Sequence, residues 1–151
     1  MPCGRFSGTI ETMTQDNARP VASDPLRTIA RSRPSIVRGS SSLREVAQMM
    51  IDQSCSAVVV KDRDGGHHVV TERDIVRALS TGADPDKEWA VDVMSVDLRT
   101  LGPDHTIAEA AALMQDAVIR HVVVADPGDP EAVAMVSIRD LLEPFLNSLE
   151  A

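Results

Sequence analysis

Aromatic residues are scarce in this sequence: its 151 residues include two Phe, one Trp and no Tyr. Proteins that bind single-stranded nucleic acid stack bases on aromatic side chains, and this chain has few such platforms. Positive charges are also few: the sequence has 15 Lys and Arg and 23 Asp and Glu, which gives a formal net charge of −8. Affinity for nucleic acid comes mainly from neutralising phosphates, so this balance argues against a protein that wraps a nucleic-acid polymer.

Cysteine and long apolar runs are also scarce. Cys3 lies in a polar segment and Cys55 just before an apolar run, so we expect neither a disulfide nor a metal-binding pair, and we interpret Cys55 as a small core residue. No apolar run approaches the roughly 18 residues of a membrane span, and the N-terminus lacks the apolar core of a signal peptide. We therefore expect a soluble, cytoplasmic protein of ordinary globular composition, 43% apolar and 25% charged.

The sequence does contain an internal repeat. Residues 43–50 are answered by 107–114, residues 57–60 by 121–124, and residues 71–76 by 137–142. The first two blocks recur at one offset and the third at a slightly longer one, so the second copy has a longer loop. A duplicated unit forms a cleft between its copies, and we expect the functional site there.

The repeat sets the expected domain boundaries. Residues 1–24 are polar and lack periodicity, which predicts a disordered leader. We place the first repeat with its lead-in at 25–80, a linker at 81–91, the second repeat at 92–147 and a tail at 148–151. Neither copy buries its apolar sheet face alone, so we expect the two copies to pack together.

Local signals predict the same elements in each copy. Ser42 with Glu45, and Thr106 with Glu109, are capping boxes that open helices. Each helix carries one apolar stripe at i, i+3, i+4 and i+7. The stripe residues are Leu43, Val46, Ala47 and Met50 in the first copy and Ile107, Ala110, Ala111 and Met114 in the second.

Short apolar runs at 58–60 and 122–124 predict buried strands. A second strand follows at 69–70 and at 133–136, and helices beginning at Thr71 and Ser137 close the copies. Brief leading strands are expected at 35–37 and 99–101. The fold class is therefore α+β, with two repeats that each pack a small three-stranded sheet with two helices.

Residues 71–79, after an apolar strand, and the matching 137–142 resemble the end of a CBS (cystathionine β-synthase) domain. Residues 93–95 and 119–124 are similar to further segments of that family, and the resemblance covers about 34–147. It implies a tandem pair of pseudo-symmetric repeats, often called a Bateman module, whose clefts commonly hold AMP, ADP, ATP or S-adenosylmethionine. It also implies that two modules associate into a disk-like homodimer.

In the family pattern, the Thr or Ser and the Asp three residues later reach the ligand's ribose, while the other copy meets the base and phosphates. The resemblance implies one cleft formed by Thr71, Asp74, Thr100, Leu101, Arg120 and His121. It implies a second cleft formed by Ser137, Asp140, Ile36, Val37, Ser56 and Ala57.

The chemistry of the first set suits a nucleotide. A carboxylate accepts hydrogen bonds from ribose hydroxyls, a Thr hydroxyl and free helix amides donate to ligand oxygens, and Arg120 and His121 offer donors for a phosphate. Ser56 and Ala57 replace these two cations in the second set. We therefore expect unequal clefts, with a nucleotide preferring the first.

A purely structural interpretation of the two hydroxyl–carboxylate pairs stays open. Thr71 with Asp74, and Ser137 with Asp140, have the N-cap and N3 spacing of a helix start, which contributes about 1 kcal/mol without any ligand.

Three other positions qualify the resemblance. Val59 and Val123 stand where the family often has Pro, and His68 and Ala134 stand where Gly is usual just before the last strand. His68 either narrows its cleft or adds a polar contact. It forms no metal site with His67, because neighbouring strand residues point to opposite faces and no further ligand completes a set.

Three function classes follow. They are a nucleotide-sensing regulatory module, a ligand-independent dimerising or partner-binding module, and an enzyme. The enzyme is disfavoured because no nucleophile, base and orienting group recur together, so we expect no catalytic residues and no required cofactor. We expect output through an unidentified protein partner, the oligomer or ligand buffering, and dimer contacts from the helices at 43–51 and 107–116.

Overall fold

The computed structural model describes residues 18–30, 33–61, 63–64, 66–95 and 99–151. The chain divides into two compact units. Of the described residues, unit 1 holds those from 34 to 95, and unit 2 combines 99–151 with those from 18 to 33. Within the described residues, no helix is both long enough and apolar enough to cross a membrane.

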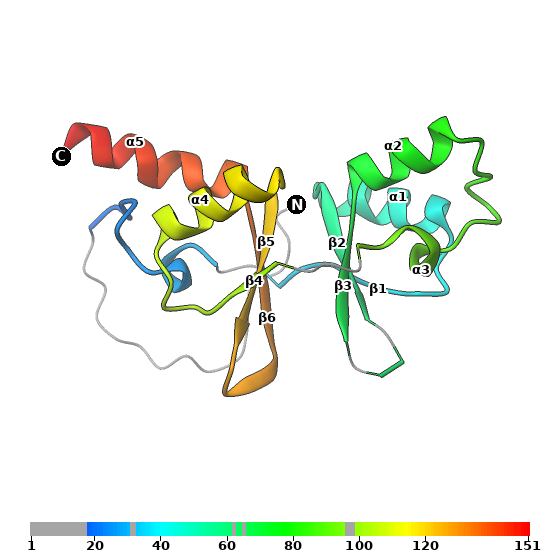
Figure 1. The fold of residues 1–151 in the computed structure, drawn as a ribbon, viewed down its shortest axis with the longest axis horizontal. Coiled ribbons are helices and arrows are strands. Elements are labelled where there is room, and N and C mark those ends of the chain that lie inside the picture. Colours follow the sequence, from blue (N-terminus) through cyan, green and yellow to red (C-terminus); the bar gives the residue numbers. More distant parts are fainter. Residues whose placement is uncertain (1–17, 31–32, 62, 65, 96–98) are drawn as a thin grey trace. The chain divides into compact units, whose positions relative to one another are not determined.

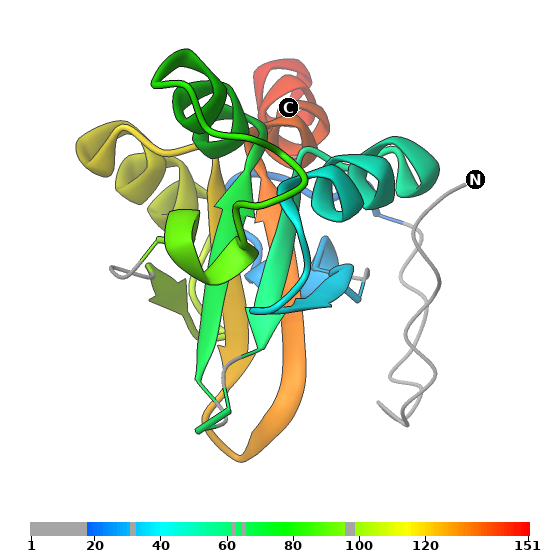
Figure 2. The same cartoon turned by 90° about the vertical axis from the view of Figure 1, so that its right-hand side faces the viewer.

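Unit 1 is a three-stranded sheet covered by helices. Its elements in chain order are β1 (Ile36–Arg38), α1 (Leu43–Gln53), β2 (Ala57–Lys61), β3 (His67–Thr71), α2 (Glu72–Ser80) and α3 (Ala90–Val93). The sheet order is β1-β2-β3, with β1 parallel to β2 and β2 antiparallel to β3. The three helices lie on the same side of this sheet (Figures 1 and 2).

Unit 2 repeats this topology. Its elements are the 3-10 helix η1 (Leu26–Thr28), β4 (Thr100–Leu101), α4 (Ile107–Ala117), β5 (His121–Asp126), β6 (Asp129–Ser137), the 3-10 helix η2 (Ile138–Leu141) and α5 (Leu142–Glu150). The order is β4-β5-β6, again with one parallel and one antiparallel pairing. The predicted α+β class, with two repeats of a three-stranded sheet and helices, is confirmed.

The first helix of each unit begins at its predicted capping box. In α1, Ser42 N donates to Glu45 Oε2 at 2.7 Å and Glu45 N donates to Ser42 Oγ at 3.2 Å. In α4, Thr106 N donates to Glu109 Oε2 at 2.6 Å and Glu109 N donates to Thr106 Oγ1 at 3.1 Å. The hydrogen bonds from Thr106 hold the pKa of the Glu109 carboxyl below its ordinary value.

The C-terminal ends of α1 and α4 have a turn that the sequence does not predict. The residue after each helix adopts the left-handed conformation: Ser54 has φ 51° and Val118 has φ 56°. The following amides, of Cys55 and Ile119, then donate back to the carbonyls of Met50 and Met114, both at 3.0 Å. This turn is usually made by Gly or Asn, so a β-branched Val there is strained.

Each unit has its own apolar core between sheet and helices. In unit 1, Val46 and Met50 of α1 pack with valines of all three strands, Val37 of β1 among them, and with Ala90 of α3. In unit 2, Ile107, Ala110 and Met114 of α4 pack with strand residues and Leu141. The apolar stripes of α1 and α4 are therefore buried inside their own units, and the dimer contacts expected from these helices stay a prediction.

Residues 18–30 belong to unit 2, although the sequence analysis assigned 18–24 to a disordered leader and 25–30 to the first repeat. Leu26 N donates to His105 O at 2.7 Å, and Ile107 N donates to Asp24 O at 2.9 Å. The Leu26 side chain is fully buried in the core of unit 2. Residues 1–17 of the expected leader lie outside the described residues.

The expected linker at 81–91 folds against α1. Leu43 N donates to Glu88 O at 3.0 Å, and Arg44 Nη2 donates to Asp86 Oδ2 at 2.9 Å. The hydrogen bond from Arg44 lowers the pKa of the Asp86 carboxyl. These contacts make the segment part of unit 1.

The closing helices differ between the copies. Thr71 caps an uninterrupted α2, whereas Ser137 is followed by the 3-10 helix η2 before α5 begins. Pro144 explains the difference, because it cannot donate an amide hydrogen bond and so falls in the first turn of α5, where none is needed. The helix continues to Glu150, into the expected tail.

Candidate functional site

The strand-to-helix junction of unit 1 is built around Thr71 and Asp74. Thr71 ends β3 and caps α2. Its amide and its hydroxyl both donate to Asp74 Oδ2 at 2.9 Å, and Asp74 N points back at Thr71 Oγ1 at 3.4 Å. The structural interpretation of this pair is thus realised: the two residues stabilise the start of α2 without a ligand.

The second carboxylate oxygen of Asp74 lies outside the cap. Asp74 Oδ1 is 3.6 Å from Arg77 Nη1, one helical turn further along α2. The Asp74 side chain is 17% exposed and Arg77 is 68% exposed, so the carboxylate is sheltered while its partner can move away. Sequence reasoning did not assign Arg77 to the site, although its i, i+3 spacing from Asp74 was the available signal.

The other candidate residues of unit 1 differ in their pairing with this junction and in their exposure. Ala57 is the register partner of Thr71 across β2 and β3, and the Ser56 carbonyl accepts from Glu72 N at 3.0 Å. Ile36 on β1 is half exposed, whereas Val37 is buried in the core of unit 1. Val37 can therefore meet a ligand only through its backbone.

Unit 2 repeats the junction at Ser137 and Asp140. Ser137 N and Ser137 Oγ donate to Asp140 Oδ2 at 2.7 and 2.9 Å. Asp140 is exposed, and the residue equivalent to Arg77 is Glu143, so this carboxylate has no cation one turn along its helix. The two junctions therefore share one hydrogen-bond pattern and differ in charge.

Arg120 and His121, the two phosphate donors of the first predicted set, lie beside the unit 2 junction. His121 is the register partner of Ser137, and the Arg120 carbonyl accepts from Ile138 N at 2.8 Å. The Arg120 guanidinium is exposed and forms no ion pair with any residue in the described part of the chain. It is available to an anion from solution.

The β4 candidates are placed by their pairing with β5. Thr100 is in register with Val123 and Leu101 with Val124. Thr100 is exposed, while Leu101 packs against the core of unit 2.

The twelve candidates thus gather as one half-site in each unit. Unit 1 holds Thr71, Asp74, Ser56, Ala57, Ile36 and Val37, and unit 2 holds Ser137, Asp140, Arg120, His121, Thr100 and Leu101. Each predicted ligand set draws on both units, so the pairing of the half-sites stays a prediction.

Several backbone amides at the unit 1 junction already have hydrogen-bond partners. At the unit 1 junction, the amides of Thr71, Glu72 and Asp74 are engaged by Asp74 Oδ2, Ser56 O and Thr71 Oγ1. The Thr71 hydroxyl hydrogen is engaged as well. Asp74 Oδ1 takes no part in the cap.

The departures from the family pattern have local explanations. Val59 N donates to Ser35 O at 2.8 Å and Val123 N donates to Arg99 O at 3.2 Å, bonds that a Pro could not make. Ala134 packs in the core of unit 2. His68 Nδ1 lies 3.1 Å from Ser95 O, so the polar contact of this imidazole is made within unit 1.

Metal-ligating residues do not cluster in the part of the chain that the structure describes: no group of three or more His, Cys, Asp or Glu side chains could hold an ion. Cys55 is partly buried against the core of unit 1, and its Sγ lies 3.8 Å from Ser35 Oγ. Cys3 lies outside the described residues.

Two stretches of the chain, residues 26–81 and 90–147, match the family model of the CBS domain. The chain belongs to the CBS domain family. It is 32% identical over 121 residues to an uncharacterized protein of Methanopyrus kandleri. The aligned region covers 76% of this chain and 61% of that protein. The chain therefore spans about three-fifths of the length of this relative.

Solved structures of other CBS domain proteins are similar. A CBS domain protein of Pyrobaculum aerophilum, solved in complex with AMP, is 27% identical with a TM-score of 0.72, covering 83% of this chain and 96% of that one. A CBS-domain-containing protein of Agrobacterium tumefaciens is 22% identical with a TM-score of 0.72, covering 89% and 98%. The chain thus shares both the family and the fold of tandem CBS proteins.

Proposed function

We propose that this CBS pair is a regulatory, non-catalytic module that senses an adenosine nucleotide of the AMP, ADP or ATP type. The supporting observation is that the hydroxyl–carboxylate junction occurs once in each unit, with only Oδ2 of each Asp used by the cap. The remaining Oδ1 is an acceptor suited to ribose hydroxyls. The AMP complex of the similar Pyrobaculum aerophilum protein supports the ligand class.

The preferred ligand set is the one with cations. Asp74 and Thr71 would hold the ribose, while Arg120 and His121 meet the phosphate, with Thr100 and Leu101 beside the base. Arg120 is exposed and unpaired among the described residues, so binding a phosphate breaks no existing ion pair. The second set, with Ser137, Asp140, Ile36, Val37, Ser56 and Ala57, lacks these donors and should bind more weakly.

Titration calorimetry of the purified protein with AMP, ATP and S-adenosylmethionine tests the proposal. Asp74→Ala removes the ribose acceptor and Arg120→Ala removes a phosphate donor. A hydrogen bond to a charged group contributes about 1.5–3 kcal/mol, so each change should weaken AMP about tenfold or more. Arg120→Ala should weaken AMP more than it weakens adenosine.

Two control variants separate binding from stability. Asp92→Ala removes a capping carboxylate of the same kind, because Asp92 Oδ2 accepts from Trp89 N at 3.1 Å at the start of α3. It should lower the melting temperature and leave AMP affinity unchanged. Lys87→Ala removes an exposed cation outside the candidate set. If Asp74→Ala and Arg120→Ala bind AMP like the wild type, the assigned residues are wrong.

A second candidate function is a CBS module that dimerises or binds a partner without any ligand. The observation that favours it is the reciprocal capping hydrogen bonding of Thr71 with Asp74, a role that needs no ligand. It takes precedence if none of the three adenosyl ligands binds. In that case Asp74→Ala should lower thermal stability alone.

A further inference from the structure

Arg77 lies beside the oxygen that the proposed function assigns to the ribose. Its Nη1 is 3.6 Å from Asp74 Oδ1, the carboxylate oxygen that takes no part in the cap. The Asp74 side chain is only 17% exposed, so little of this carboxylate is open to a second partner. A ribose hydroxyl that donates to Asp74 Oδ1 therefore competes with the Arg77 guanidinium for the same oxygen.

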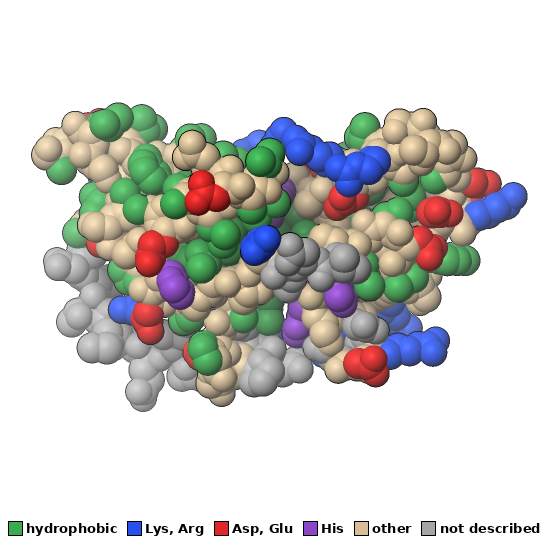
Figure 3. All heavy atoms as spheres, viewed as in Figure 1, with side chains coloured by type: hydrophobic (Ala, Val, Ile, Leu, Met, Phe, Trp, Pro, Cys, Tyr) green, Lys and Arg blue, Asp and Glu red, His purple; other side chains and the backbone are tan. Residues whose placement is uncertain are grey.

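The ion pair between these two side chains can be opened. Arg77 is 68% exposed, and an ion pair with one partner so exposed contributes little to stability. Figure 3 shows basic side chains at the surface over the beginning of α2. Because the arginine stem is long and flexible, the guanidinium can leave Asp74 and stay close to the junction.

Arg73 provides an internal comparison on the same helix. It lies one turn before Arg77, is also exposed, and forms no ion pair with any residue that the structure describes. The two arginines thus have the same charge and similar exposure, and they differ in their contact with Asp74.

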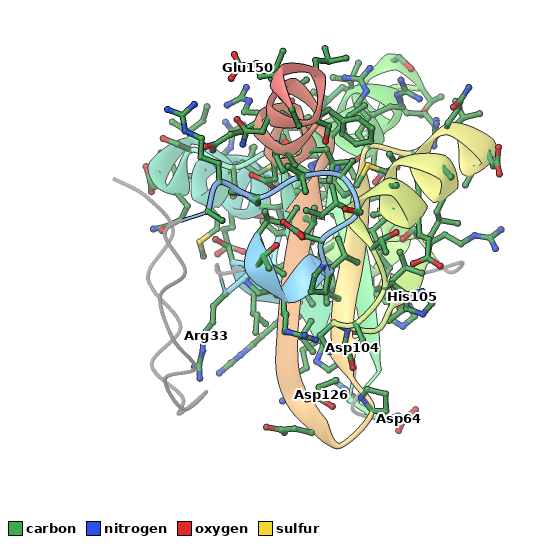
Figure 4. The ribbon with its side chains drawn as sticks, turned by 90° about the vertical axis from the view of Figure 1, so that its left-hand side faces the viewer. Arg33, Asp64, Asp104, His105, Asp126 and Glu150 are labelled. Carbon is green, nitrogen blue, oxygen red and sulfur yellow. The ribbon has the colours of Figure 1, made fainter. Side chains whose placement is uncertain are left out.

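The junction of unit 2 lacks this competitor. Glu143 stands at the position of Arg77, so no cation lies one turn after Asp140. The ion pair of α5 is at the opposite end of the helix, where Arg19 Nη1 is 3.9 Å from Glu150 Oε2. Figure 4 shows Glu150 at that outer end. A ribose that binds Asp140 therefore displaces no arginine.

We propose that Arg77 is a specificity-determining residue that favours a phosphorylated nucleoside over the unphosphorylated one, an inference that rests on the proposed function. Either ligand displaces Arg77 from Asp74 Oδ1. A nucleotide carries its 5′-phosphate on the same ribose, so the displaced guanidinium gains a new anionic partner. Adenosine brings no anion, so its binding breaks the Asp74–Arg77 pair without replacing it.

Titration calorimetry with adenosine and with AMP tests the proposal. Arg77→Gln should bind adenosine about two- to fivefold more tightly than the wild type, because nothing then competes for Asp74 Oδ1. It should bind AMP about two- to fivefold more weakly, because one phosphate partner is lost. Arg73→Gln removes the same charge and should leave the affinity for adenosine unchanged. Arg77→Lys keeps the charge and should keep the preference for AMP.

The salt dependence of adenosine binding provides a second measurement. Raising NaCl from about 50 mM to about 500 mM screens the exposed Asp74–Arg77 pair. The affinity of the wild type for adenosine should therefore rise with salt towards that of Arg77→Gln, whose own affinity should stay constant. Arg120→Ala provides a contrast, because losing a phosphate donor alone weakens AMP without strengthening adenosine.

The outcomes separate this inference from the proposed function. If neither the wild type nor Arg77→Gln binds any adenosyl ligand, both are overturned. If AMP binds and Arg77→Gln gains no affinity for adenosine, the role of Arg77 is overturned and the proposed function stands. The same holds if Arg73→Gln matches Arg77→Gln, because general charge then explains the effect. Tighter adenosine and weaker AMP in Arg77→Gln alone support the proposal.

Discussion

Replacing Val118 by Gly should stabilise unit 2. Val118 follows α4 with φ 56° and ψ 42°, the left-handed region in which a β-branched side chain crowds its own backbone. The side chain contributes little in return, because the residue is 75% exposed. The turn itself is anchored by Ile119 N, which donates to Met114 O at 3.0 Å and leads the chain towards Arg120 and His121.

The magnitude follows from three opposing terms. The left-handed conformation costs an L-residue about 1–2 kcal/mol, with Val at the upper end, and Gly removes this cost. Gly also loses more chain entropy on folding, about 0.5–1 kcal/mol. Removing the quarter of the side chain that is buried loses about 0.5 kcal/mol of apolar burial. The net gain in the free energy of unfolding is about 1 kcal/mol, or about 2–4 °C in melting temperature for a chain of this size.

Differential scanning calorimetry of Val118→Gly measures this shift. Ser54→Gly, at the equivalent turn after α1 with φ 51°, should also stabilise but by less, because Ser is not β-branched. Val76→Gly is the matched control: Val76 is exposed within α2, where Gly has no conformational advantage and should cost about 1 kcal/mol. If Val118→Gly lowers the melting temperature as Val76→Gly does, the strain argument fails.

Two further predictions concern unit 2. Glu109→Ala should lower the melting temperature near neutral pH, with a gap to the wild type that narrows as the pH falls. The pKa of Glu109 is depressed in the folded chain, so the stability that this carboxylate contributes is present above the ordinary carboxyl pKa and is lost as the pH drops through the folded pKa. A difference in melting temperature between variant and wild type that stays constant from about pH 7 to about pH 3 would contradict this. Leu26→Ala should cost about 3 kcal/mol by urea denaturation, because Leu26 is fully buried among α4 residues. A cost under about 1 kcal/mol would show that the lead-in segment does not belong to that core.

Much of the fold follows from local signals. The capping boxes at Ser42 and Thr106 and the periodic stripes behind them predict α1 and α4, because a helix start and an apolar face depend only on nearby residues. The short valine runs predict β2 and β5 for the same reason. The left-handed turns at Ser54 and Val118 escape prediction, because neither residue favours that conformation.

Other features depend on contacts distant in sequence. Leu26 lies in the lead-in that the sequence places with the first repeat, yet tertiary packing puts it in one core with Ile107 of unit 2. At the candidate site, the spacing of Thr71 and Asp74 predicts the cap, and the structure adds that the cap uses Asp74 Oδ2 and not Asp74 Oδ1. Spacing could not reveal this, because it does not count the hydrogen bonds each atom already makes.

The position of residues 18–30 has a consequence for how the protein is made. Among the described residues, unit 1 is continuous and is flanked on both sides by pieces of unit 2. During synthesis, the segment that carries Leu26 leaves the ribosome before unit 1 does, but its partners around Ile107 follow only after unit 1 has been translated. Unit 1 can then fold while the apolar segment around Leu26 still lacks its packing partners. Unit 2 is therefore completed after unit 1, although one of its segments is made before unit 1.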